Sequence, residues 1–202
     1  MAKAKRRNRA PQMPPEERRK QLLAAGVACI AAKGIGSTRH ADLARACEVS
    51  VPAVFSYFPN REALVISILN EVGEQLFEHV IKPALALPEP AQQLAATAPL
   101  FTEYAEQQPD YVKVWLMWSM HFAPDVREQY RQFEQQIVDA LAKMMMTEEP
   151  EDDPEEDFRD RARMILASSA FLAKMVFDGV SEKRRQAFVQ HVLEPLAATK
   201  RA

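Results

Sequence analysis

The most constraining stretch of this chain runs from Arg39 to Phe58 and has the pattern of two short helices joined by a tight turn. Small apolar residues predict the packing face of the first helix, which ends before a turn at residues 47–49. Ser50 is a natural N-cap for the second helix, and Pro52 falls in the first turn, where its missing N–H costs nothing. We expect the second helix to bury Val54, Phe55 and Phe58 and to expose Val51, Ala53, Ser56 and Tyr57. A short helix with small and hydroxyl side chains outside fits the major groove of DNA.

The formal net charge of −2 hides an uneven distribution of charge along the 202 residues. Residues 1–61 carry twelve Lys and Arg side chains against four Asp and Glu, whereas residues 62–202 carry fourteen against twenty-four. A polyanion would attract the first segment and repel the second. The pattern predicts that only the N-terminal part approaches nucleic acid, and that the acidic remainder serves self-association or ligand binding.

Apolar residues recur at helical spacing along most of the chain, with few glycines and almost no strand-like alternation, so we predict an all-α fold. Residues 1–13 lack this spacing and are predicted to form a flexible basic arm. Residues 14–61 are predicted to form a DNA-binding domain, and residues 62–202 a larger helical domain. A long helix from Glu62 to Val80 is expected to connect the two domains, and Pro83 is expected to break the chain after it. We find no internal repeat.

The C-terminal half is predicted to contain helices over residues 91–107, 111–122, 126–146, 156–178 and 182–198. The helix over 156–178 is apolar or small around much of its circumference, which is typical of a helix buried on more than one side. In a chain of this size we expect such a helix to be shared with a second copy, and we predict a homodimer through the last two long helices. The acidic run 148–157 is predicted to be a solvated loop, with a binding tail as the alternative.

Several other classes of protein are not expected. Cys29 and Cys47 lie on apolar helix faces and are expected to be reduced core residues. No apolar run approaches the ~18–20 residues needed to cross a bilayer, so we expect a cytoplasmic protein without membrane contact. The four histidines lack metal-ligand spacing, and we expect no metal or other cofactor. No nucleophile–base pair, phosphate loop or pair of catalytic carboxylates is recognisable, so an enzyme is not expected.

Short motifs along residues 16–70 resemble the N-terminal signature of the TetR family of bacterial transcriptional regulators. They are Lys33-Gly34-Ile35-Gly36, Ala41-Asp42-Leu43-Ala44, Val49-Ser50-Val51, Val54-Phe55, Tyr57-Phe58-Pro59 and Arg61-Glu62 with Leu64. A narrower resemblance, to the LuxR/HapR-type quorum-sensing regulators, extends to about residue 120 through Val112–Ser119. Two features depart from that branch: Ser56 stands where asparagine is common, and the arginines of the arm are spaced differently.

The resemblance implies a TetR-like fold of about nine helices, in which a three-helix DNA-binding domain precedes a helical domain for dimerisation and ligand binding. It also implies a homodimer on double-stranded DNA. Two recognition helices about 34 Å apart would reach successive major grooves of a pseudo-palindromic operator. The fold also occurs in TetR-like nucleoid-occlusion factors, so an architectural DNA binder with a protein partner is the alternative to a gene regulator.

The residues around the helix starts are candidates for the phosphate contacts that position a protein on DNA: Ser37, Thr38, Arg39, Tyr57 and Asn60. Capping and exposed polarity are the alternative for Ser37 and Thr38, whereas the resemblance implies that Tyr57 reaches the DNA backbone. Base choice would depend on the outer face of the second helix, formed by Ser50, Val51, Ala53 and Ser56. The arm is expected to enter the minor groove or to follow phosphates, with a solubility tail as the alternative, through Arg6, Arg7 and Arg9.

Trp115 and Trp118 lie three residues apart on one predicted helix of the larger domain. An aromatic pair at this spacing is ordinarily part of a core, which remains the alternative. The resemblance implies instead that Trp115 lines a ligand cavity. The further candidates for this pocket are Leu76, Phe77, Leu100, Trp118, Phe133 and Ser169. Because none of them is charged, the sequence predicts an apolar small-molecule ligand.

Overall fold

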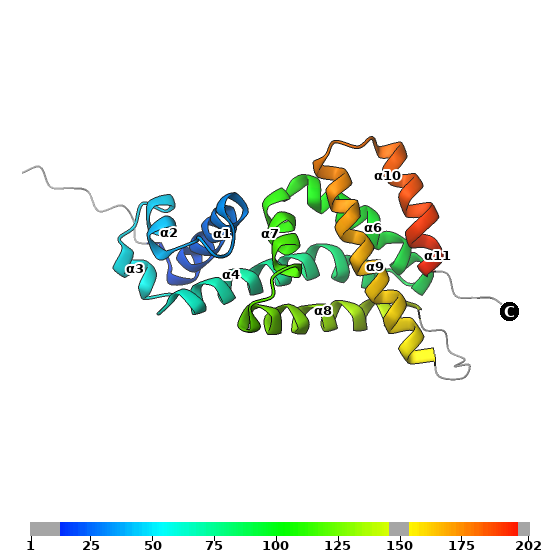
Figure 1. Ribbon diagram of the computed structural model, residues 1–202, viewed down its shortest axis with the longest axis horizontal. Helices are drawn as coiled ribbons and strands as arrows, with labels where there is room; N and C mark the ends of the chain where they lie inside the picture. Colours follow the sequence, from blue (N-terminus) through cyan, green and yellow to red (C-terminus); the bar gives the residue numbers. More distant parts are fainter. Residues whose placement is uncertain (1–12, 146–153, 198–202) are drawn as a thin grey trace, which may run out of the picture.

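The computed structural model describes residues 13–145 and 154–197, and every regular element within these ranges is a helix. The helices form an elongated molecule, with α1, α2 and α3 at one end and α10 and α11 towards the other (Figure 1). The predicted all-α fold is confirmed. The elements are α1 Pro15–Lys33, α2 His40–Ala46, α3 Val51–Phe55, α4 Arg61–Leu76, η1 Phe77–Ile81, α5 Lys82–Leu85, α6 Pro90–Gln107, α7 Pro109–Ser119, α8 Pro124–Met145, α9 Pro154–Phe177, α10 Glu182–Phe188, η2 Val189–Leu193 and α11 Glu194–Ala197, where η marks a π-turn.

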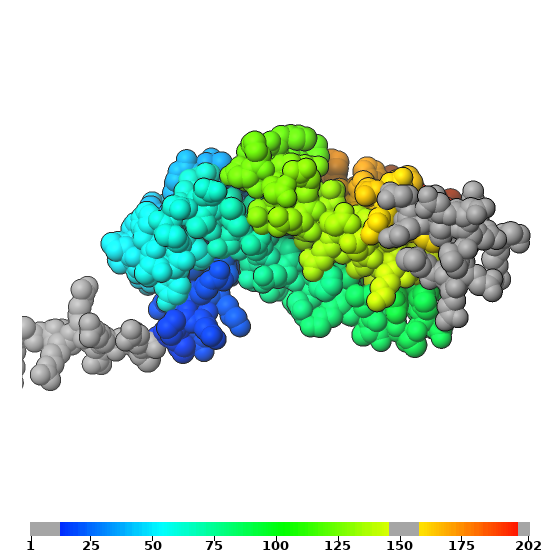
Figure 2. All heavy atoms as spheres, turned by 90° about the horizontal axis from the view of Figure 1, so that it is seen from below, coloured from blue at the N-terminus to red at the C-terminus, as the bar shows by residue number. Residues whose placement is uncertain are grey.

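The small end of the molecule consists of α1, α2 and α3, and it is built from the local signals in the sequence. Helix α1 ends at Gly34, as predicted, where a positive φ of 85° turns the chain away and the backbone N–H bonds the carbonyl of Ile30. Helix α3 begins after Ser50, whose hydroxyl accepts the backbone N–H of Ala53 at 3.3 Å, as the prediction of an N-cap requires. The region of α3, in cyan, forms the tip of the molecule when it is seen from below (Figure 2).

Helix α4 runs from the small end into the larger domain and packs against both (Figure 1). Two glycines mark its closest approaches to other elements. A Cβ atom on Gly26 of α1 would lie 2.5 Å from Cδ1 of Ile68 in α4. A Cβ atom on Gly73 of α4 would lie 2.9 Å from Cδ2 of Phe133 in α8. Helix α4 is therefore in direct van der Waals contact with α1 at one end and with α8 further along the molecule.

The prediction that Pro83 breaks the chain is wrong, because helical structure continues from α4 through η1 and α5 to Leu85. Proline lacks an N–H, and in a regular α-helix its ring clashes with the carbonyl four residues earlier. Just before Pro83 the helix widens into the π-turn η1, after which the N–H of Lys82 bonds the carbonyl of Phe77, five residues back. The wider turn accommodates the proline within the helix.

The same device recurs near the C-terminus, where the π-turn η2 precedes Pro195. Residues 79–83 and 191–195 share the pattern His-Val-x-x-Pro. In both copies the histidine Nδ1 hydrogen-bonds the carbonyl four residues earlier, at 2.9 Å for His79 and 2.6 Å for His191. The two segments are a short structural repeat that the sequence analysis missed.

Cys29 is half-buried, Cys47 is buried, and neither forms a disulfide bond. Burial raises the pKa of both thiols, as expected for cysteines that pack against a core. Among the helices of residues 13–145 and 154–197, none combines the length and the apolar character that crossing a membrane would require.

Candidate functional site

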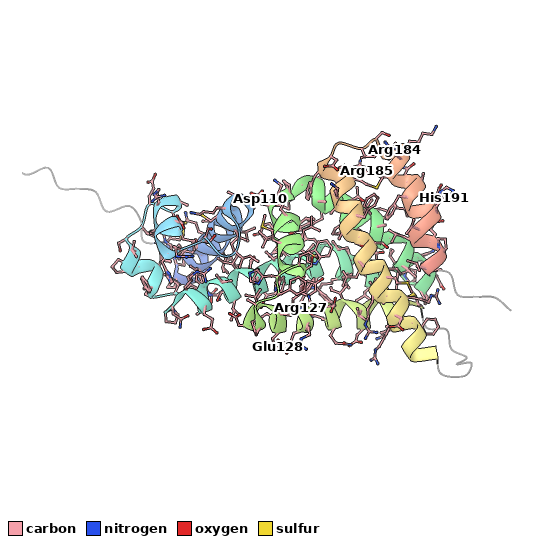
Figure 3. All side chains as sticks on the ribbon, viewed as in Figure 1. Asp110, Arg127, Glu128, Arg184, Arg185 and His191 are labelled. Carbon is pink, nitrogen blue, oxygen red and sulfur yellow. The ribbon has the colours of Figure 1, made fainter. Side chains whose placement is uncertain are left out.

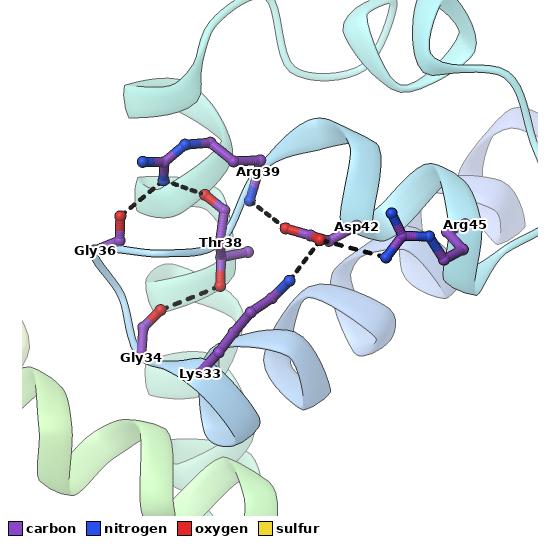
Figure 4. Close-up of polar contacts among 7 residues, drawn as sticks. All are labelled: Lys33, Gly34, Gly36, Thr38, Arg39, Asp42 and Arg45. Atoms are coloured by element: carbon purple, nitrogen blue, oxygen red, sulfur yellow. Dashed lines mark hydrogen bonds and ion pairs between the residues drawn. The ribbon is translucent and has the colours of Figure 1, made fainter.

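The loop between α1 and α2 is held in place by hydrogen bonds to its own carbonyl groups (Figure 4). Thr38 is fully buried and donates its hydroxyl to the carbonyl of Gly34 at 3.2 Å. The guanidinium of Arg39 folds back on the loop and donates to the carbonyl of Gly36 at 2.7 Å. Arg61, at the start of α4, donates to the same carbonyl at 3.0 Å. These contacts join the loop to the start of α4 and fix the position of α2.

This arrangement corrects one of the predicted phosphate contacts. The hydroxyl of Thr38 lies inside the protein and donates to the carbonyl of Gly34, so it is not available to DNA. It does not cap α2 either, because the N-cap of that helix is Arg39. Ser37 and Arg39 are exposed on the same loop and remain candidates. The arginine can still offer N–H groups outward, because only one of its terminal nitrogens makes the hydrogen bonds to the loop.

Asp42 orders the start of α2. Its carboxylate accepts the backbone N–H of Arg39 at 2.8 Å and pairs with the ammonium of Lys33 at 2.5 Å (Figure 4). The hydrogen bond from Lys33 is the largest of the effects that hold the pKa of Asp42 below its usual value. Asp42 thereby joins the end of α1 to the beginning of α2.

The outer face of α3 carries the four residues predicted to read bases. Ser50, Val51 and Ser56 are exposed, and Ala53 is half-buried. The hydroxyl of Ser56 donates to the carbonyl of Ala53 at 2.7 Å, which leaves its oxygen free to accept a hydrogen bond. The structure thus places the four residues together on one short helix at the tip of the molecule.

The structure confirms two of the three inward positions predicted for the second helix, since Val54 and Phe58 are fully buried. The prediction for Phe55 is wrong, because 44% of this residue is exposed. Its ring is stacked on the imidazole of His40, with centroids 3.9 Å apart and planes inclined by 6°. His40 occupies the space beneath the ring and so keeps Phe55 on the surface.

Tyr57 and Asn60 follow α3 at the start of α4. Asn60 is exposed and caps α4 by accepting the backbone N–H of Ala63 at 2.8 Å, so its amide nitrogen remains available as a donor. Tyr57 is half-buried beside Phe58, with ring centroids 6.5 Å apart. Both stay candidates for phosphate contacts. The three arginines predicted for the minor groove, Arg6, Arg7 and Arg9, lie outside the described residues.

A cavity of about 100 Å³ lies between the α4–η1 helix, α6, α7, α8, α9, η2 and α11. Four of the seven predicted pocket residues line it: Leu76, Trp115, Phe133 and Ser169. The other three, Phe77, Leu100 and Trp118, do not line it. Trp118 is fully buried, donates Nε1–H to the carbonyl of Val126 at 3.2 Å, and stacks on Phe133. Trp118 therefore packs against Phe133, a residue of the cavity wall, without lining the cavity itself.

None of the predicted pocket residues is charged, whereas Glu194 of α11 also lines the cavity. The apolar wall residues that the sequence analysis missed include Leu94, Phe101, Ile137 and Leu193. On the outer side, Arg185 of α10 (labelled in Figure 3) donates to Glu106 of α6 at 2.6 Å and ties these two helices together. The cavity can therefore accommodate an apolar group close to one carboxylate.

Within the part of the chain that the structure describes, no three His, Cys, Asp or Glu side chains are grouped so that they could hold a metal ion.

The fold and these two regions define a class of protein: an all-α protein with an N-terminal helix-turn-helix and a cavity-bearing helical domain. Residues 22–68 match the sequence model of the family described as bacterial regulatory proteins, tetR family. The chain is 36% identical over 109 residues to the HTH-type transcriptional regulator LuxR of Vibrio harveyi. That match covers 54% of this chain and 53% of LuxR, so it spans about half the length of the relative.

Solved structures share the fold over nearly the whole chain. A putative transcriptional regulator from Pseudomonas aeruginosa PAO1 has a TM-score of 0.75 at 15% identity, over 92% of this chain and 93% of the other. The transcriptional regulator FadR from Bacillus subtilis, solved in complex with stearoyl-CoA, has a TM-score of 0.71 at 18% identity, over 90% of this chain and 99% of FadR. These likenesses show the shared fold, and the match to the tetR family itself lies in residues 22–68.

Proposed function

We propose that this protein is a transcriptional regulator that binds double-stranded DNA through the helix-turn-helix formed by α2 and α3. The observation that carries this proposal is the exposed face of α3 at the tip of the molecule, within the segment that matches the tetR family. The loop before α2 is fixed by Arg61 and Thr38, so α3 and the exposed groups of the loop form one preformed surface. A preformed surface limits the entropy lost on binding. A regulator that binds the chromosome works in the cytoplasm.

The active unit in this proposal is a homodimer on a pseudo-palindromic operator. Helix α9 carries two large exposed apolar side chains, Met164 at 47% and Phe171 at 52%. Phe171 packs on Phe188 of α10 with ring centroids 5.2 Å apart, so the two helices offer one continuous apolar surface. Pairing this surface with its own copy would bury it and make the contact isologous. Phe171→Lys is expected to convert the dimer to a monomer in sedimentation experiments and to weaken operator binding.

The cavity supports a further element of the proposal, control by a small ligand with a mainly apolar body. Phe133 provides the physical connection, because it lines the cavity and also touches Gly73 of α4, the helix that leads to the DNA-binding domain. A ligand that moves Phe133 would shift α4 and with it the separation of the two recognition helices. Such a ligand acts only if it binds one arrangement of the dimer more tightly than the other. The solved complex of FadR with stearoyl-CoA shows that a relative in fold binds a ligand with a long apolar chain.

Genomic occupancy tests the proposal. The tagged wild-type protein and a Tyr57→Ala variant would be mapped at low and at high cell density. We expect a small number of promoter sites that share a palindrome and are lost in the variant. A change of occupancy with cell density would support a quorum-sensing role, for which the basis is the resemblance to the LuxR/HapR-type branch.

Two other outcomes would count against the proposal. Many dispersed sites away from promoters would favour an architectural DNA binder. Sites that persist unchanged in the Tyr57→Ala variant, or no sites at all, would contradict DNA recognition by the helix-turn-helix.

A further inference from the structure

Phe55 is an exposed aromatic ring on the surface that we propose binds DNA. It lies one helical turn after Val51, which is 37% exposed, so the two side chains form an apolar strip along α3. Single apolar residues on a surface are common and need no explanation. A strip of two on a five-residue recognition helix, beside the exposed Ser56, is a distinct feature of that face.

The ring of Phe55 is held in one orientation by the residue beneath it. His40 is buried, and its imidazole lies parallel to the Phe55 ring at 3.9 Å. The Nε2 atom of His40 lies 2.8 Å from the carbonyl oxygen of Phe58. Because a carbonyl only accepts hydrogen bonds, Nε2 must carry the hydrogen, and this bond fixes the plane of the imidazole. One face of Phe55 is thus supported from below, and the opposite side remains open.

The major groove offers one apolar group to such a ring, the C5-methyl group of thymine. The polar atoms of base edges gain nothing from a phenyl ring, and phosphates would lose hydration against it. A ring fixed in advance also loses little side-chain entropy when it meets a methyl group.

We propose that Phe55, supported by His40, is a specificity-determining residue that contacts a thymine C5-methyl group in each half of the operator. This inference rests on the proposed DNA-binding function. It assigns to α3 an apolar reading position in addition to the hydroxyl and small side chains of its outer face.

The test is a methyl-deletion cycle on an operator selected from random DNA with the wild-type protein. Each thymine is replaced in turn by deoxyuridine, which removes only the C5-methyl group, and Kd is measured by fluorescence anisotropy. For wild type we expect one symmetric position at which the replacement weakens binding about fourfold per half-site, the value of one buried methyl group. For Phe55→Ala we expect weaker binding to the thymine operator and no further loss at that position.

Two variants make the result interpretable. Tyr57→Ala removes a proposed phosphate contact and is expected to weaken binding to every operator while the methyl dependence stays. Phe55→Leu keeps an apolar side chain without the stacked ring, and it is expected to reduce the methyl dependence. It replaces Phe55→Ala in the methyl-deletion experiment if Phe55→Ala does not fold. A methyl dependence that persists in the Phe55 variants, or none in wild type, overturns the role of Phe55. If the wild-type protein selects no DNA sequence, the proposed function itself fails.

Discussion

The DNA-binding end and the cavity end of this molecule are stabilised in different ways. At the DNA-binding end, Thr38, Arg39 and Arg61 tie the loop to its neighbours through short polar contacts, and Gly26 leaves no room for an added methyl group. At the cavity end there is an unfilled space of about 100 Å³ beside two π-turns. The buried hydroxyl of Tyr104 has no hydrogen-bond partner among the described residues. The DNA-binding end is held by polar contacts around one loop, whereas the cavity end leaves space unfilled and one buried hydroxyl unpaired.

Helix α4 is the element that both ends share. It contacts Gly26 through Ile68 at the DNA-binding end and Phe133 through Gly73 at the cavity end. Close-packed interfaces transmit small displacements because they have few voids in which a shift could be absorbed. The shared helix therefore suits a regulator in which a change at the cavity displaces the DNA-binding end through α4.

The largest expected effect comes from deleting the same side chain at each end. Leu43 is fully buried in α2, whereas Leu141 of α8 is buried but faces the cavity. We expect Leu43→Ala to lower the free energy of unfolding by about 4 kcal/mol and Leu141→Ala by about 2 kcal/mol, because Leu141 already lacks contacts on one side. Urea denaturation measures both losses. Equal losses would show that the two ends are packed alike.

A smaller effect is expected from adding one methyl group where α1 meets α4. Helix propensity alone predicts that Gly26→Ala stabilises the protein by about 1 kcal/mol. Because the new Cβ atom would lie 2.5 Å from Cδ1 of Ile68, we expect overpacking to reverse the sign and give a net loss of about 1 kcal/mol. The control is Ile68→Ala, which removes Cδ1 and also Cγ1, the second close atom at 2.7 Å, so that Gly26→Ala should cost much less in this background. A stabilising Gly26→Ala in the wild-type background would refute the close packing at this point.

The ion pair of Asp42 with Lys33 gives the DNA-binding end a specific dependence on pH. Since the pKa of Asp42 is lowered by folding, its contribution is present above the ordinary carboxyl value of 3.8 and is lost as the pH falls through the lowered pKa. Asp42→Asn keeps an acceptor for the N–H of Arg39 but removes the charge. We expect it to cost about 0.7 kcal/mol at pH 7, since more than a third of the Lys33 side chain is exposed to solvent.

Urea denaturation at several pH values checks this prediction. The difference between Asp42→Asn and wild type should shrink as the pH is lowered from 5 to about 2, because both proteins then carry a neutral side chain at this position. A difference that stays constant over this range would mean that the ion pair contributes nothing to stability.

The smallest expected effect concerns the turn between α2 and α3. Glu48 has a φ of 54°, in the left-handed region that favours glycine. Glu48→Gly is expected to raise the free energy of unfolding by about 0.5 kcal/mol, because relief of strain exceeds the extra entropy of glycine in the unfolded chain. Glu48→Ala is the control and should bring no such gain, as alanine keeps the Cβ atom. Thermal unfolding of wild type and the two variants measures these differences, and an equal stability of Glu48→Gly and Glu48→Ala would contradict strain at this residue.

The features that were predictable from the sequence depend on local chemistry. Ser50 and Pro52 fix the start of α3 within one turn, and Gly34 ends α1. The position of Phe55 was not predictable from its periodicity, because the side chain that displaces it, His40, comes from another helix.

The cavity was predicted less completely for a related reason. Leu76 and Phe77 are neighbours on one helix and point in different directions, so that Leu76 lines the cavity and Phe77 does not. Trp115 and Trp118 share one helix, but the hydrogen bond of Trp118 to Val126 across the following loop draws it behind the wall. Contacts between segments far apart in the sequence decide which side chains line the cavity, and the apolar pattern of a single helix carries no information about those contacts.

The tip formed by α2 and α3 is proposed to recognise a palindromic DNA sequence. The most direct measurement is the Kd of the purified protein for a selected palindrome and for the same DNA scrambled, both at physiological salt. We expect the palindrome to be bound at least about 10³-fold more tightly than the scrambled DNA, as is usual for specific recognition. Equal affinity for the two DNAs, weakening together as salt is added, would contradict it and leave only nonspecific attraction to phosphate.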